Sequence, residues 1–140
     1  MNDKTEIENK VKHFLHNRPE ISFAYIFGSF IQNENYHDID IAIYLYKDFD
    51  KNDFKKFPYG YESNMISELT LLVRKKIDFI VMNNTDITLQ QRIINKGLLL
   101  FSKDEHIRIS YENLIRKLYI DSENIRRIKR KYLNKKISDA

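Results

Sequence analysis

The sequence predicts an α/β (α+β) fold, in which a small mixed β-sheet has helices packed against it. Two observations predict this fold class. Apolar runs of strand length occur near residues 21–27, 38–45 and 77–82, and segments with apolar residues at helical spacing stand between and after them. Because the 140 residues contain no linker-like stretch, we expect a single domain over 1–140, with a core of about 5–102 and a C-terminal helical segment of about 103–134.

The N-terminal part of the chain predicts a helix followed by a strand. A capping box from Thr5 to Glu8 opens the helix, and Pro19 lies just beyond its apolar stripe. The first strand then runs from about Ile21 to Phe27. After the second strand, the segment Lys47 to Tyr61 is charged and aromatic and contains Pro and Gly, so we expect a surface loop that flanks the active site.

The middle of the chain predicts two more helices and two more strands. An amphipathic helix precedes the third strand, and these residues form its core-facing stripe: Met65, Ile66, Leu69, Leu72 and Val73. A short helix follows near Thr88 to Asn95, and Gly97 ends it. The last strand is expected at Leu98 to Phe101.

A final helix is predicted from a second capping box, Ser102 to Glu105, to about Leu133, with a break near Asp121-Ser122. The residues expected to face inward are Ile107, Tyr111, Leu114, Ile115 and Leu118. Such a small core cannot cover the far end of this helix, which leaves Ile125, Ile128 and Tyr132 available for a partner. The basic run 126–136 fits a solvated helix face or a surface for an acidic partner, and we do not expect a nucleic-acid partner because no recognition module accompanies it.

Composition excludes several classes of protein. The net charge is +4, and the chain contains no Cys, which excludes disulfides and thiolate metal sites and is compatible with a reducing cytoplasm. No signal-peptide pattern and no run of membrane-spanning length occurs, so we expect a cytoplasmic protein without a membrane partner. His13 and His16 share a helical face, but no third ligand accompanies them, so a zinc site is not expected.

Three carboxylates stand at the starts of predicted strands: Asp38, Asp40 and Asp78. Side chains two apart on a strand share a face, so Asp38 and Asp40 should lie side by side and repel each other unless a cation lies between them. Mg²⁺ prefers such hard oxygen ligands, in an arrangement that leaves room for substrate phosphates. A carboxylate from a neighbouring strand completes a two-metal site for an in-line displacement, and we therefore predict these three residues as catalytic and metal-binding.

A Gly-Ser turn lies shortly upstream of the carboxylates. Gly28 lets the backbone turn sharply and approach a ligand closely, and the Ser29 hydroxyl can hold phosphate oxygens, so we predict both as nucleotide-binding. Either fragment alone is an ordinary structural feature, because Gly-Ser forms turns and Asp-x-Asp often ends an element. Their combination favours a metal–nucleotide site.

Four segments together resemble the nucleotidyltransferase superfamily typified by DNA polymerase beta, and in particular its minimal nucleotidyltransferase (MNT) members. The segments are Tyr25-Ile-Phe-Gly-Ser-Phe, His37-Asp-Ile-Asp-Ile-Ala-Ile, Lys76-Ile-Asp-Phe-Ile-Val-Met-Asn-Asn and Leu89 to Phe101. The resemblance extends over roughly residues 22–133, including a tail similar to the C-terminal helix of MNT antitoxins. Two features depart from the family pattern: the loop between Ser29 and Asp38 is short and lacks the usual Gly, and His37 replaces a small residue.

The resemblance implies a nucleotidyltransferase fold and a reaction. Gly28 and Ser29 would hold the terminal phosphates of ATP, Asp38 and Asp40 would bind two Mg²⁺ ions, and Asp78 would bind the metal that activates the acceptor hydroxyl. MNT proteins of this size are similar to antitoxins that transfer AMP from ATP to a tyrosine of a cognate HEPN ribonuclease toxin. That activity is our principal expectation, because a protein acceptor needs no deep pocket within this chain. Two alternatives remain: a nucleotidyltransferase for a small molecule such as an aminoglycoside, and a non-catalytic antitoxin that neutralises by binding.

Overall fold

The computed structural model describes residues 3–138 and confirms the predicted mixed sheet. Its four strands are β1 (Ile21–Phe27), β2 (Asp38–Leu45), β3 (Lys76–Val81) and β4 (Leu98–Ser102), and they lie side by side in the order β3-β2-β1-β4. Strand β1 is antiparallel to β2 and β4, whereas β2 and β3 are parallel. Because β2 and β3 are parallel neighbours, their first residues lie side by side at the same end of the sheet.

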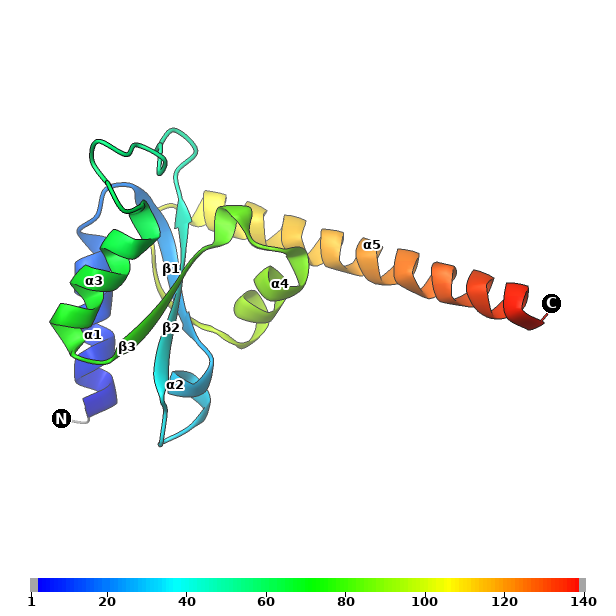
Figure 1. Cartoon of the computed structure of the whole chain (residues 1–140), viewed down its shortest axis with the longest axis horizontal. Coiled ribbons are helices and arrows are strands. Elements are labelled where there is room, and N and C mark those ends of the chain that lie inside the picture. The colour runs from blue at the N-terminus through cyan, green and yellow to red at the C-terminus, as the bar shows by residue number, and fades with distance from the viewer. Residues whose placement is uncertain (1–2, 139–140) are drawn as a thin grey trace.

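Helices cover both faces of the sheet (Figure 1). The first face carries α1 (Asp3–His16) and α3 (Tyr61–Val73), and the second carries α4 (Ile87–Lys96) and the first part of α5 (Glu105–Ser138). Two short helices, α2 (Ser29–Gln32) and the 3₁₀ helix η1 (Met82–Asn84), follow β1 and β3. Beyond the sheet, α5 extends away from the rest of the domain. No helix within residues 3–138 is both long and apolar enough to cross a membrane.

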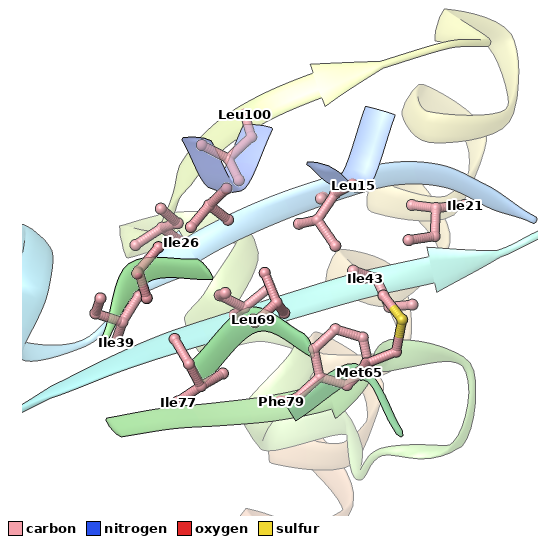
Figure 2. Packing of buried hydrophobic residues seen from close by; sticks show 14 of the residues in the cluster. Leu15, Ile21, Ile26, Ile39, Ile43, Met65, Leu69, Ile77, Phe79 and Leu100 are labelled. Carbon is pink, nitrogen blue, oxygen red and sulfur yellow. The ribbon is translucent and has the colours of Figure 1, made fainter. Parts of the chain in front are cut away.

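The strands divide their side chains between two apolar clusters, as the period of two in a β-strand requires. From β2, Ile39, Ile41 and Ile43 are buried against α1 and α3 (Figure 2). The intervening Ala42 and Tyr44 belong to the second cluster, against α4 and α5. Odd-numbered residues of β2 therefore face α1 and α3, and even-numbered residues face the opposite side.

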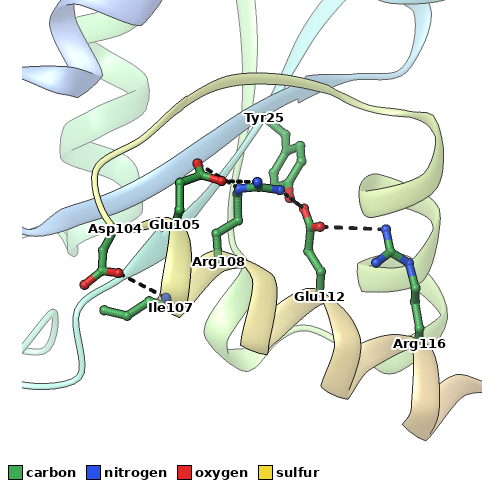
Figure 3. A network of polar contacts seen from close by, with 7 residues as sticks. All are labelled: Tyr25, Asp104, Glu105, Ile107, Arg108, Glu112 and Arg116. Carbon is green, nitrogen blue, oxygen red and sulfur yellow. Dashed lines mark hydrogen bonds and ion pairs between the residues drawn. The ribbon is translucent and has the colours of Figure 1, made fainter.

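A buried polar network attaches α5 to β1 (Figure 3). The Tyr25 hydroxyl on β1 donates a hydrogen bond to the Glu112 carboxylate on α5. Arg108 Nη1 donates to the same carboxylate at 3.0 Å, and Arg116 Nη2 lies 3.7 Å from its other oxygen. Burial, followed by the hydrogen bond to Glu112, raises the pKa of Tyr25 well above its ordinary value, so the phenol stays a proton donor.

Both predicted capping boxes are wrong in detail. Helix α1 already includes Asp3, so Thr5 lies inside it. At the other helix, the Ile107 backbone N–H donates to Asp104 Oδ1 at 3.2 Å, so Asp104 is the cap in place of Ser102. Asp caps a helix as well as Ser does, and the later cap leaves Ser102 free to end β4.

Three further expectations about loops and the last helix are corrected. Helix α5 is continuous through Asp121-Ser122, because one Asp and one Ser among strong helix formers do not outweigh the neighbouring turns. Leu114 and Leu118 were expected to face inward but are 53% and 39% exposed, because the face of α5 that carries the buried Tyr111 and Ile115 packs on the domain instead. The loop 46–60 follows the end of β2, so it lies about 20 Å along the strand from the carboxylates at its start and does not flank them.

Candidate functional site

The structure brings the three predicted carboxylates to one face of the sheet. In the parallel pair of β2 and β3, Asp40 lies opposite Asp78, and Asp38 lies opposite Lys76. Asp38 and Asp40 are even-numbered on β2 and so face the side of α4 and α5. On β3, Ile77 and Phe79 are buried in the other cluster, which turns Asp78 to the same side as the two β2 carboxylates.

Asp38 and Asp78 lie close enough to Asp40 to change its protonation. Asp40 is half-buried, whereas Asp78 is exposed. Burial, then a hydrogen bond with Asp78, then the charges of Asp78 and Asp38 raise the pKa of Asp40 to about 6. Lys76 acts in the opposite direction, and its Nζ lies 3.8 Å from Asp38 Oδ2. A cation placed among these oxygens would remove the repulsion between them.

The turn after β1 lies directly against this carboxylate group. Gly28 has φ 76°, and a Cβ atom at this position would be 2.1 Å from Asp40 Oδ2. Any other residue would meet both the unfavourable backbone region and the carboxylate, so the close approach requires glycine. The Ser29 hydroxyl donates to the backbone carbonyl of Asp38 at 3.3 Å, which ties the turn to the start of β2.

The donor set fits a magnesium ion that binds together with a nucleotide. No group of three or more His, Cys, Asp or Glu side chains within residues 3–138 is arranged to hold a metal by itself. Mg²⁺ does not need such a cage, because it keeps several waters and is usually held by one or two carboxylates plus substrate phosphates. The facing pair Asp40 and Asp78, with Asp38 beside it, supplies carboxylates of that kind.

One residue of this site was not singled out from the sequence. Lys76 lies opposite Asp38 only because β2 and β3 pair in parallel with this register, and the spacing of the two residues along the chain does not reveal it. The sequence could have indicated Lys76 through its position two residues before Asp78, because residues two apart on a strand lie on the same face. The lysine brings a positive charge to the edge of the carboxylate group.

A cavity of about 570 Å³ lies at the other end of β2, against the start of α5. The residues that line it are Tyr44, Tyr46, Lys47, Asp48, His106, Ile107, Ser110, Tyr111 and Leu114. None of the three carboxylates contributes to it, so this cavity is separate from the candidate site.

Comparison with known proteins identifies the family. The model of the family described as polymerase beta, nucleotidyltransferase, matches residues 9–106, which include Gly28, Ser29 and all three carboxylates. The chain belongs to this nucleotidyltransferase family. No curated protein matches it.

Solved structures of toxin–antitoxin complexes share the fold. A structure of the MntA–HepT toxin–antitoxin pair matches with a TM-score of 0.67 at 18% identity, over 88% of this chain and 92% of that chain. A toxin–antitoxin structure with AMP-PNP matches with a TM-score of 0.69 at 20% identity, over 86% and 92%. A tri-AMPylated HEPN toxin in complex with MNT antitoxin, from Shewanella oneidensis, matches with a TM-score of 0.69 at 20% identity, over 89% and 92%. The similarity confirms the MNT-type fold.

Proposed function

We propose that this protein is an antitoxin that acts as a Mg²⁺-dependent protein adenylyltransferase in the cytoplasm. It would transfer AMP from ATP to a tyrosine of a cognate HEPN-type ribonuclease toxin. The observation that carries the proposal is the grouping of Asp38, Asp40 and Asp78 on one sheet face, against a glycine turn that fits closely on Asp40. A nucleotidyltransferase needs carboxylates and phosphate-binding backbone at one place, and this grouping provides both.

Each carboxylate of the site would have a role in nucleotidyl transfer. The acceptor oxygen attacks the α-phosphorus of ATP, pyrophosphate leaves, and the acceptor loses its proton. Magnesium, when bound, would neutralise charge on the phosphate oxygens, and Asp38, Asp40 and Asp78 would hold it. Asp78 is the exposed member of the three, so it is the carboxylate best situated to meet the acceptor hydroxyl and to accept its proton.

Two neighbouring groups would position the nucleotide. Gly28 lets the backbone come close to the carboxylates, so phosphates held at the turn lie beside the same oxygens that hold the metal. Lys76 Nζ adds a positive charge beside Asp38 and favours the binding of an anionic triphosphate. Catalysis then depends mainly on positioning and charge neutralisation, which explains the small number of polar residues at the site.

The protein acceptor is supported by the solved relatives and by the shape of the chain. One of the structures that share this fold is an AMPylated HEPN toxin in complex with its MNT antitoxin, and another contains AMP-PNP. In this chain, the second half of α5 extends away from the domain with exposed apolar residues, as a protein-binding element does. That exposed helix also favours a second candidate, an antitoxin that neutralises its toxin by binding alone.

Labelled ATP tests the proposal. The protein is incubated with Mg²⁺ and the product of the neighbouring gene, tested as the proposed cognate toxin, using ATP that carries ³²P at either the α or the γ position. We expect label on the partner from α-labelled ATP only, and no label with the Asp78→Asn variant. Asp50→Asn is the matched control, because Asp50 lies in the loop at the opposite end of β2 and an amide can still accept its hydrogen bond from Asn52.

The outcomes separate the candidate functions. Label from γ-labelled ATP would identify phosphoryl transfer and contradict the proposal. A stable, non-toxic complex without any label would identify the binding antitoxin. Transfer to an added aminoglycoside, with the HEPN-type protein unlabelled, would identify the small-molecule enzyme.

A further inference from the structure

One series of apolar residues along α5 follows a heptad repeat that continues past the edge of the domain. Ile107 and Tyr111 begin the repeat against the sheet, and Leu114 and Leu118 extend it. Ile125, Ile128 and Tyr132 continue it at the same alternating intervals of four and three residues, with Asp121 as its one polar position. These last three apolar side chains are 54%, 65% and 61% exposed, so the second half of the seam has no cover within the described residues.

We propose that this seam, defined as Leu114, Leu118, Ile125, Ile128 and Tyr132, binds one amphipathic helix of a different protein, whose own apolar seam is flanked by acidic residues. Seven-residue spacing of apolar positions is the pattern by which two helices pack together as a coiled coil. The part of α5 beyond the domain, from residue 119 to 136, is roughly 27 Å long, enough for about two and a half heptads of a partner helix.

The charges beside the seam determine the chemistry of the partner. The positions that flank a coiled-coil seam are occupied by Lys117, Asn124 and Lys131 on one side and by Ser122, Lys129 and Lys136 on the other. The four lysines are exposed, and Lys136 Nζ lies 5.5 Å from the centre of the Tyr132 ring. Flanking charges set partner choice in coiled coils, so a basic border selects acidic residues on the other helix.

The same border disfavours a second copy of this chain. In a parallel coiled coil of two copies, the flanking residues on one side of the seam of the first helix face those on the other side of the seam of the second helix. In an antiparallel coiled coil, the flanking residues on a given side of one helix face the residues on the same side of the other helix. Either arrangement places lysines of one copy opposite lysines of the next, and like charges across such an interface oppose association.

The cavity at the start of α5 lies at one end of the seam. Ile107, Tyr111 and Leu114 line this cavity and are also members of the heptad repeat, so the seam leads directly into it. Its volume of about 570 Å³ accommodates a large side chain from the partner. A bulky apolar anchor seated in a pocket, with polar residues around it, is the usual centre of binding energy in an interface.

This inference rests on the proposed function only for the existence of a protein partner, and its test involves neither ATP nor the toxin. Two labelled synthetic helices carry the same three-heptad apolar seam, with Glu at all flanking positions in one and Lys in the other. Fluorescence anisotropy measures the binding of each peptide to the whole protein. We expect the Glu peptide to bind at least about tenfold more tightly than the Lys peptide.

Paired variants separate the seam from the rest of the helix. Ile125→Ser with Ile128→Ser removes two seam residues and should weaken binding of the Glu peptide by about tenfold or more. Glu123→Ser with Arg130→Ser changes two residues on the opposite face, also leaves the net charge unchanged, and should alter affinity by less than about twofold. Lys129→Glu with Lys131→Glu leaves two lysines and two glutamates beside the seam, so it should abolish the preference for the Glu peptide. Circular dichroism confirms that each variant remains folded.

Four results would overturn the inference. The first is equal affinity for the two peptides, and the second is an equal effect of the seam pair and the opposite-face pair. The third is sedimentation of the wild-type protein as a dimer that the Ile125→Ser, Ile128→Ser pair dissociates, which would make a second copy the occupant. The fourth is tight binding of single-stranded RNA that depends on Lys129 and Lys131 but not on the two isoleucines, which would make the helix a nucleic-acid surface.

Discussion

Gly28 on the turn after β1 lies so close to Asp40 on β2 that a Cβ atom at residue 28 would be 2.1 Å from the Asp40 Oδ2 atom. The glycine turn and the central carboxylate of the candidate site therefore lie against each other, with no room for a side chain at residue 28. The carboxylate cannot keep its place beside any residue larger than glycine.

We expect Gly28→Ala to abolish nucleotidyl transfer and to lower the free energy of unfolding by about 1–3 kcal/mol, through the clash with Asp40 and the positive φ. Chemical denaturation measures the second effect. Gly60→Ala is the matched control, because Gly60 also has a positive φ, of 96°, but no atom lies within 4 Å of the added Cβ. Gly60→Ala should lose some stability and retain full transfer; equal transfer by both variants would contradict the assigned contact.

Asp40→Asn should stabilise the metal-free protein above about pH 6. The folded state raises the pKa of Asp40 to about 6 from its ordinary value of 3.8, so the ionised carboxylate opposes folding at neutral pH. That penalty disappears as the pH falls through 6 toward 4, because the folded protein then takes up the proton. Urea unfolding with EDTA at pH 7.5 and pH 4.5 should show an advantage for Asp40→Asn at the higher pH that shrinks at the lower one. An equal advantage at both would refute the charge repulsion.

Magnesium should bind weakly without a nucleotide. The described residues hold no ready set of three metal ligands, so phosphate oxygens are needed to complete the coordination. Thermal denaturation should show a small shift with Mg²⁺ alone, a small shift with a non-hydrolysable ATP analogue alone, and a larger shift with both than the sum of the two. Asp78→Asn should remove this excess. A full shift with Mg²⁺ alone would indicate a preformed metal site.

The hydrogen bond between Tyr25 and Glu112 should stabilise the attachment of α5 to the sheet. Tyr25→Phe removes the donor but leaves Glu112 paired with Arg108, so we expect a loss of about 1 kcal/mol in the free energy of unfolding. Tyr59→Phe is the control, because Tyr59 is 90% exposed and should show no measurable loss. If the two variants are equally stable, the buried network does not contribute to the attachment.

Much of this fold could be predicted from local patterns. The limits of β1 follow from a mostly apolar run, interrupted only by Ser22, that ends at Gly28. The shared face of Asp38 and Asp40 follows from the period of two in a strand. The helix predicted near Thr88 to Asn95, with Gly97 as its stop, corresponds to α4. These features depend only on residues that are near each other in the chain.

Features that depend on pairing between distant segments could not be predicted. Lys76 reaches Asp38, and Tyr25 reaches Glu112, only through the register of the sheet and the docking of α5. The cap of α5 was misplaced because Ser102 and Asp104 are both good caps, and the extent of β4 decides between them. The expected break near Asp121 failed because the cooperativity of a long helix outweighs one unfavourable turn.

The central claim is that this chain transfers AMP to a protein, and intact-mass spectrometry tests it most directly. The product of the neighbouring gene, tested as the proposed cognate toxin, is weighed after incubation with this protein, Mg²⁺ and ATP, and in parallel with an Asp38→Ala, Asp40→Ala double variant. We predict an increase in the partner's mass by one or more AMP groups with the wild type and none with the double variant. An unchanged mass, in a partner that is nevertheless bound and neutralised, would contradict the account and leave an antitoxin that acts by binding.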